Sequence, residues 1–223
     1  MILFAIDPVN VTQSNNITHH QFFVDGPAGK IEALLSVPKK QNALQAVAVV
    51  CHPHPLHQGS MNNKVTYTIA KTYNDLGVPA LRFNFRGVGE SDGEFANAIG
   101  EEQDLIAVCK KLREVFPSEE LWLAGFSFGA YIALRSHDKV GAEKLVTVAP
   151  AIHLYDFSDI QLPAYPWLLI QGDEDEIVPA DQVIEWVKNL RNPPELVIAE
   201  GVGHFFHRRL GDIKAAIENY ILN

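Results

Sequence analysis

The chain has 223 residues, of which 47% are hydrophobic and 20% are charged, and its formal net charge is −9. This length suits one larger α/β domain with a buried core, so we expect a single domain over residues 1–223. An acidic surface does not attract nucleic acid or an anionic membrane, and we expect neither as a partner.

The cysteines and the start of the chain predict a cellular location. Cys51 and Cys109 lie in apolar runs and offer no disulfide framework, which is typical of core thiols in a reducing compartment. The apolar run that follows Met1 is too short for a signal peptide or a membrane span. We therefore expect a cytoplasmic protein.

The first part of the chain is predicted to hold a loose arm and a β-hairpin. Residues 1–18 end in a polar, asparagine-rich stretch, for which we expect no regular structure. The segments 20–24 and 30–37 flank a Gly- and Pro-rich turn and predict the hairpin. The continuous apolar run 46–51 indicates a strand covered on both faces, hence a parallel sheet.

The rest of the chain alternates between helical periodicity and short apolar runs, which predict helices and strands in turn. The predicted strands are 79–85, 121–124, 144–149, 167–171 and 195–199. The predicted helices are 61–76, 101–116, 130–136, 180–190 and 206–221. This order predicts an α/β fold with a doubly wound, mostly parallel sheet and an antiparallel edge. Ligand sites in such sheets lie outside the carboxyl ends of the strands.

One motif combines a strand, a sharp turn and a helix. Gly125-Phe126-Ser127-Phe128-Gly129 has the G-x-S-x-G pattern, and it follows an apolar run and precedes helix-forming residues. The two glycines permit a close approach of backbone segments that side chains would prevent. We expect Ser127 in a strained conformation, with the helix N-terminus beside it. The motif predicts a nucleophile; the alternative is a Gly-rich turn with an idle serine.

A serine hydroxyl needs a base within reach and a third group that orients the base. In this architecture the chain order is serine, acid, histidine. His204 lies in a Gly-rich loop between the last predicted strand and helix, so it is the expected base. The acid comes from four adjacent carboxylates, Asp173 to Glu176. Asp175 is the preferred candidate and Asp173 the alternative, and the remaining acids are expected to be a solvated loop.

With these motifs the sequence resembles the α/β-hydrolase superfamily over nearly its whole length. The segment 172–179 is similar to the family's G-x-x-D-x-x-V-P pattern, which implies Asp175 as the acid, and His204 corresponds to the family's histidine. Segments 51–64 and 81–91 resemble small bacterial hydrolases with little or no lid, similar to carboxylesterases and dienelactone hydrolases. The resemblance implies a catalytic triad and no metal or organic cofactor.

Acyl transfer also needs preorganised N–H donors where the carbonyl oxygen becomes negative. The first is expected at Phe128, directly after the candidate nucleophile. The second follows from the family's His-Gly-x-Pro-Leu pattern, which implies His54, with Leu56 as the alternative. Pro53 and Pro55 have no N–H and cannot serve.

Other polar clusters have simpler interpretations. The three histidines at positions 52, 54 and 57 match no zinc-ligand spacing, and we expect His52 to brace its loop. Arg82 and Arg86 are expected to be structural, paired with acids such as Glu90 or Asp92. Asp104 is expected to be an acid near a helix N-terminus.

These features predict a single-domain serine hydrolase that cleaves a small carboxylic ester through Ser127, His204 and Asp175. Segment 150–163 is the candidate lid, and its short length suggests an open site for a small ester. Its candidate pocket residues are Ile152, Leu154, Tyr155 and Phe157. The alternatives are a thioesterase, amidase or peptidase with the same residues, or a non-catalytic binding protein of the same fold. The sequence leaves the natural substrate and the oligomeric state open.

Overall fold

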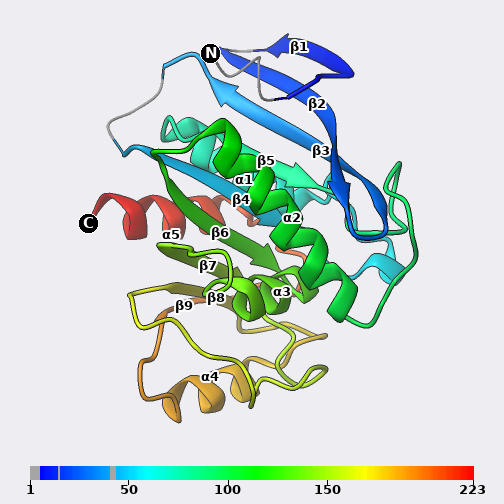
Figure 1. Ribbon diagram of the computed structural model, residues 1–223. Coiled ribbons are helices and arrows are strands. Elements are labelled where there is room, and N and C mark those ends of the chain that lie inside the picture. Colours follow the sequence, from blue (N-terminus) through cyan, green and yellow to red (C-terminus); the bar gives the residue numbers. More distant parts are fainter. Residues whose placement is uncertain (1–5, 15, 41–43) are drawn as a thin grey trace.

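The computed structural model describes residues 6–14, 16–40 and 44–223, and Figure 1 shows their arrangement. The strands of this part are β1 (Asn10–Ser14), β2 (Ile17–Gly26), β3 (Gly29–Pro38), β4 (Ala46–Cys51), β5 (Ala80–Phe83), β6 (Glu120–Phe126), β7 (Lys144–Val148), β8 (Leu168–Gly172) and β9 (Glu195–Ala199). Its α-helices are α1 (Lys64–Asp75), α2 (Ile99–Val115), α3 (Phe128–Ser136), α4 (Ala180–Lys188) and α5 (Leu210–Leu222).

The strands pair into one sheet in the order β1-β2-β3-β5-β4-β6-β7-β8-β9. Strands β1, β2 and β3 pair antiparallel, and β3 is also antiparallel to β5. Every pair from β5 to β9 is parallel. The predicted mostly parallel sheet with an antiparallel hairpin at one edge is therefore confirmed. The central strand β4 is buried along its whole length, as its continuous apolar run predicts.

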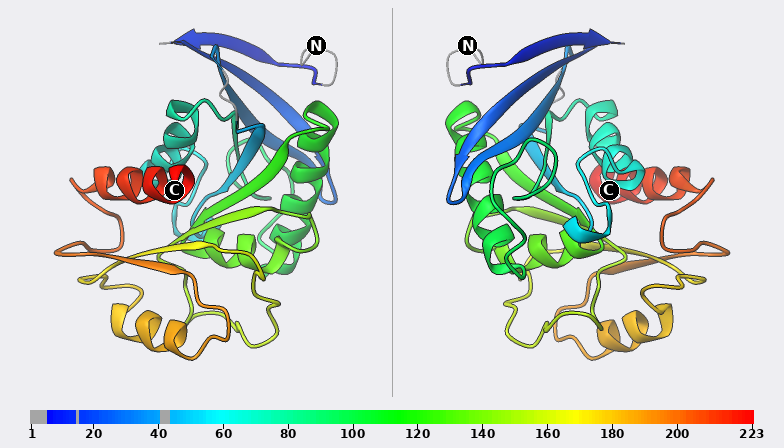
Figure 2. Two further views of the ribbon diagram at one scale, coloured as in Figure 1. Left: turned by 90° about the vertical axis from the view of Figure 1, so that its left-hand side faces the viewer. Right: turned by 90° about the vertical axis from the view of Figure 1, so that its right-hand side faces the viewer.

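Helices cover both faces of the sheet because the strand pleat sends alternate side chains to opposite sides. In β4, Ala48 and Val50 pack with α1 and α5, whereas Val47, Val49 and Cys51 pack with α2, α3 and α4. Helices α1 and α5 lie side by side in Figure 2. In the described segments no helix combines the length and the apolarity needed to cross a membrane.

The N-terminal prediction needs a correction. Of the expected loose arm, residues 1–5 and 15 lie outside the described residues, but β1 forms a regular strand on β2, with Asn10 opposite Gln21 and Ser14 opposite Ile17. All five side chains of β1 are exposed. The strand is held through its backbone, so no apolar alternation in the sequence could reveal it.

The helix boundaries depend on local backbone chemistry. Helix α1 begins at Lys64 because the Asn63 side chain accepts hydrogen bonds from the N–H groups of Val65 and Thr66. Helix α5 begins four residues later than predicted, since Phe206 and Arg208 adopt φ angles of 51° and 62°, which a helix excludes.

The carboxyl ends of the parallel strands meet at one edge of the sheet. Cys51 at the end of β4 lies opposite Gly125 of β6. Gly172 at the end of β8 lies opposite Ala199 at the end of β9. The loops that follow β4, β6, β8 and β9 therefore converge, and these loops carry the candidate site residues.

Candidate active site

The turn between β6 and α3 holds Ser127 in an unusual conformation. Its φ is 55° and its ψ is −115°, and its N–H donates to the Val148 carbonyl at 2.9 Å. A Cβ on Gly125 would lie 2.2 Å from the Gly129 carbonyl oxygen, and a Cβ on Gly129 would lie 2.5 Å from the Cys51 carbonyl oxygen. Both glycines are thus required by close backbone contacts, and these contacts hold the strained serine in place.

Ser127, His204 and Asp175 form a continuous hydrogen-bonded series. The Oγ of Ser127 lies 3.1 Å from Nε2 of His204, and Nδ1 of His204 lies 2.8 Å from Oδ2 of Asp175. All three residues are buried. Since an ionised carboxylate only accepts, Nδ1 carries the proton and Nε2 is left to accept from the serine hydroxyl. The structure therefore brings together the three residues that the sequence singled out.

The geometry distinguishes between the two candidate acids. Besides His204, the Asp175 carboxylate accepts from the Gln171 side chain at 3.1 Å and from the N–H groups of Ile177 and Val178 at 2.9 and 2.6 Å. Four donors thus fix its position, which suits an ionised acceptor. Asp173 instead accepts from the Gly201 N–H at 2.7 Å. Asp175 is therefore the acid that contacts His204.

The neighbouring acids do more than the predicted solvated loop. Asp173 and Glu176 are exposed, yet Asp173 binds the backbone at Gly201, and the Glu176 side chain accepts from the His204 N–H at 3.1 Å. Together they tie the loop after β8 to the loop after β9. Gln171 was not predicted as a site residue. The signal that could have indicated it is a lone polar residue at the end of an apolar strand.

The two candidate oxyanion donors both lie beside Ser127. Within the described part of the chain, the N–H groups of Phe128 and His54 have no hydrogen-bond acceptor. The alternative donor, the Leu56 N–H, already donates to Nδ1 of His54 at 3.1 Å. His54 and Phe128 line the same pocket as Ser127. Of the two loop candidates, His54 is the one with a free N–H.

His52 braces the loop after β4, as expected. It is fully buried; its Nε2 accepts from the Phe85 N–H at 3.0 Å, and its Nδ1 donates to the Pro53 carbonyl at 2.6 Å. Burial lowers the pKa of His52 from 6.5 to about 4. Among the described residues, no group of three His, Cys, Asp or Glu side chains could hold a metal ion.

We expect His52 to make stability depend on pH. Below pH 6.5 the unfolded chain takes up a proton that the folded protein accepts only near pH 4. Stability is therefore present at pH 7 and falls on acidification through this window, by about 3 kcal/mol for this group. Urea unfolding of the wild type and His52→Gln at pH 7 and pH 4.5 measures the difference. An equal loss of stability in both proteins would contradict the assignment.

The arginine partners differ from those expected. Arg86 pairs with Asp104 of α2 at 2.7 Å and not with Glu90 or Asp92. Arg82 donates to the Met61 carbonyl instead of to a carboxylate. Arg86 lies in the loop between β5 and α2 and Asp104 lies in α2, so the partner is beyond the loop acids that the sequence suggested. Asp104 is consequently a buried ion-pair partner as well as an acid near the start of α2.

A pocket of about 360 Å³ opens in front of Ser127. Phe128, Leu154, Tyr155, Ile177 and Phe205 supply most of its apolar wall. Of the four residues expected from segment 150–163, Leu154 and Tyr155 line the pocket, whereas Ile152 and Phe157 pack against the core. The arrangement can place a small acyl group beside a serine, a base and free N–H donors.

Several known proteins are similar to this chain in sequence. Residues 43–165 match the family model described as serine aminopeptidase, S33. The chain is 38% identical over 212 residues to an uncharacterized protein of Rickettsia prowazekii, covering 91% of this chain and 88% of that protein.

Two solved structures are also similar over most of their length. An α/β serine hydrolase without lid from Xanthomonas campestris is 40% identical to this chain, with a TM-score of 0.88. The match covers 96% of this chain and 94% of that protein. An α-β serine hydrolase homologue from Coxiella burnetii is also 40% identical, with a TM-score of 0.86. The match covers 94% of this chain and 99% of that protein.

Proposed function

Because this chain belongs to the α/β serine hydrolases, we propose that it cleaves small carboxylic esters through Ser127, His204 and Asp175. The observation that carries this proposal is the series of hydrogen bonds from Asp175 through His204 to Ser127. Ser127, at the end of this series, lines the pocket into which an ester carbonyl would enter.

In the proposed mechanism, Oγ of Ser127 attacks the ester carbonyl carbon while Nε2 of His204 takes the hydroxyl proton. The tetrahedral oxyanion accepts hydrogen bonds from the N–H groups of Phe128 and His54. His204 then gives its proton to the departing alkoxide, which leaves as an alcohol. Asp175 keeps the imidazole in the required tautomer and stabilises its cationic form.

The second half of the reaction releases the acid. His204 takes a proton from a water molecule, and the resulting hydroxide adds to the carbonyl of the acyl-enzyme. The same N–H donors hold the second oxyanion. Collapse of this intermediate breaks the bond to Ser127, whose oxygen regains the proton from His204. No metal or organic cofactor is required for these steps.

The pocket supports an ester in preference to an aminopeptidase substrate. An aminopeptidase must recognise a charged α-amino group, which calls for a carboxylate near the serine. None of the described residues that line this pocket is acidic. The aromatic and aliphatic wall suits an uncharged acyl chain instead.

A substrate panel tests this proposal. We expect the highest kcat/KM with p-nitrophenyl acetate or butyrate, lower values with octanoate and palmitate, and the lowest values with aminoacyl p-nitroanilides. Higher activity on an anilide than on the short esters would favour the peptidase alternative. Activity that rises steadily with chain length would contradict a small substrate.

Leu154 offers a way to test which groups the pocket accepts. Leu154→Trp adds bulk to the pocket wall, so we expect it to lower kcat/KM for the butyrate ester by roughly tenfold relative to the acetate ester. The matched control is Leu222→Trp, at an exposed position near the end of α5. Equal effects of Leu154→Trp on both esters would place the acyl chain elsewhere.

A further inference from the structure

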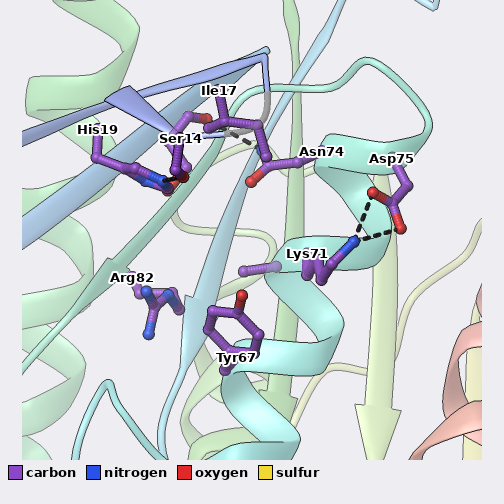
Figure 3. A pocket seen from close by; sticks show the side chains of 10 residues that line it. Ser14, Ile17, His19, Tyr67, Lys71, Asn74, Asp75 and Arg82 are labelled. Atoms are coloured by element: carbon purple, nitrogen blue, oxygen red, sulfur yellow. Dashed lines mark hydrogen bonds and ion pairs between the residues drawn. The ribbon is translucent and has the colours of Figure 1, made fainter. Parts of the chain in front are cut away.

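A second cavity, of about 270 Å³, lies between the N-terminal hairpin and α1. Figure 3 shows His19 from β2 on one side, with Tyr67, Lys71 and Asp75 of α1 and Arg82 of β5 around the rest. It shares no described lining residue with the catalytic pocket. The proposed hydrolysis makes no use of it.

Arg82 is the unusual residue of this cavity. It is only 5% exposed, yet within the described part of the chain no carboxylate lies at ion-pair distance from it. Its Nη1 donates to the Met61 carbonyl and, at 3.4 Å, to Oδ1 of Asn62, and its guanidinium lies 5.2 Å from the centre of the Tyr67 ring. Its Nε and Nη2 have no described acceptor. Burying a cation without a counter-ion is costly, and these neutral partners offset only part of that cost.

Arg86 provides the internal comparison. It follows Arg82 by four residues and is similarly buried, but the Asp104 carboxylate holds it and raises its pKa. Burial instead lowers the pKa of Arg82, because no anion offsets the loss of solvent. Arg86 therefore has a carboxylate partner inside the fold. Arg82 lines a cavity and has no such partner among the described residues.

The rest of the cavity wall does not supply the missing negative charge. Asp75 is the single carboxylate among the described lining residues, and it is already bound by Lys71 at 2.8 Å and by Lys214 at 3.0 Å. With Lys71 and Arg82 both present, the lining carries an excess of positive charge in a chain whose formal net charge is −9. Such a local excess attracts anions.

We propose that this cavity binds the carboxylate or phosphate group of a small organic anion, with Arg82 as its main counter-ion. The planar guanidinium matches the geometry of both groups through paired N–H donors. Lys71 and the Tyr67 hydroxyl, which points into the cavity in Figure 3, are the further donors. At about 30 Å³ per water molecule, the cavity holds the volume of roughly nine waters, which suits a metabolite-sized ligand.

NMR titration of the full chain tests this site. Inorganic phosphate and acetate are added separately, with sodium chloride at matched ionic strength as the reference. We expect saturable shifts of the His19 ring and of the amides around Arg82 with at least one anion beyond the effect of chloride. A response to phosphate alone identifies a phosphate ligand, and a response to acetate alone identifies a carboxylate ligand.

Two variants separate a binding site from a structural arginine. Arg82→Lys keeps the charge but loses the paired donors, so we expect roughly tenfold to hundredfold weaker binding of the responding anion. The control is Arg113→Lys, near the C-terminal end of α2, where Arg113 donates to the backbone carbonyls of Val140 and Gly141. We expect this variant to bind the anion as the wild type does. Tyr67→Phe, which removes only a hydroxyl, is expected to weaken binding several-fold.

The proposal is overturned if neither anion gives saturable shifts beyond chloride with the folded wild type. It is also overturned if Arg82→Lys, with a native spectrum, binds as tightly as Arg113→Lys. Both outcomes leave the ester hydrolysis proposal unaffected, since that proposal is tested at Ser127 with different ligands.

Discussion

Replacing Ser127 or His204 with alanine is expected to lower kcat for p-nitrophenyl acetate by about 10⁶-fold, since each removal disables the whole nucleophile system. Ser127 Oγ and His204 Nε2 are 3.1 Å apart, so the base acts on the hydroxyl directly. The double variant should be no slower than either single one, because the two groups act as a unit. Steady-state kinetics on the three proteins measure the effect.

Matched controls make this prediction specific. Ser118→Ala and His153→Ala alter exposed residues outside the pocket, and we expect wild-type rates from both. Asp175→Asn should lower kcat by about 10⁴-fold through the wrong tautomer of His204. Asp173→Asn should lower kcat far less, because Asp173 contacts the backbone at Gly201 and not the imidazole of His204. A reversed order for Asp173 and Asp175 would contradict the assignment of the acid.

Replacing Arg86 with methionine is expected to destabilise the fold by about 3–5 kcal/mol. The Asp104 side chain is 1% exposed, and its two oxygens accept from Nη2, Nε and the backbone N–H of Arg86. Loss of the guanidinium leaves a buried carboxylate without its counter-ion. Urea unfolding at pH 7 measures the change in free energy.

Two further variants test the cause of this loss. Arg86→Met combined with Asp104→Leu removes both charges, and we expect it to recover much of the stability. Lys71→Met breaks a solvent-exposed pair with Asp75, and we expect a cost below about 1 kcal/mol. If Arg86→Met and Lys71→Met cost the same, the buried pair contributes no more than a surface pair.

The nucleophile turn was predictable from sequence because its requirements are local. A Cβ at either flanking glycine would meet backbone atoms, 2.2 Å away for Gly125 and 2.5 Å away for Gly129, so only one residue type fits there. The buried parallel strands were predictable for a similar reason, since residues covered on both faces are apolar throughout. Such local constraints restrict the residue types at each position, so they can be recognised in the sequence.

The acid was harder to identify from the residues alone, because four carboxylates stand side by side. Which of them faces His204 depends on how the loop turns, and the N–H groups of Ile177 and Val178 fix that turn by binding Asp175. The family pattern pointed to the same residue. The contact of Glu176 had no sequence signature, since it depends on where two loops meet. The contact of Gln171 with Asp175 had only a weak one, a lone polar residue at the end of an apolar strand.

Pairing between separate segments explains why the partner of Arg86 and the strand β1 were predicted wrongly. The sequence suggested nearby partners for Arg86, but Asp104 reaches it from α2, across the loop that separates β5 from this helix. Strand β1 exposes every side chain and is held by backbone pairing to β2, so composition alone suggested a loose arm. Both depend on which segments the fold places side by side.

The most direct test of Ser127 as an activated nucleophile is intact-mass labelling with a fluorophosphonate, whose phosphorus forms a bond to the serine oxygen as fluoride leaves. We expect one adduct per chain on the wild type, mapped to Ser127. We expect none on Ser127→Ala and greatly slowed labelling of His204→Ala. No adduct on folded wild-type protein, or an adduct that persists in Ser127→Ala, would contradict the proposed hydrolase mechanism.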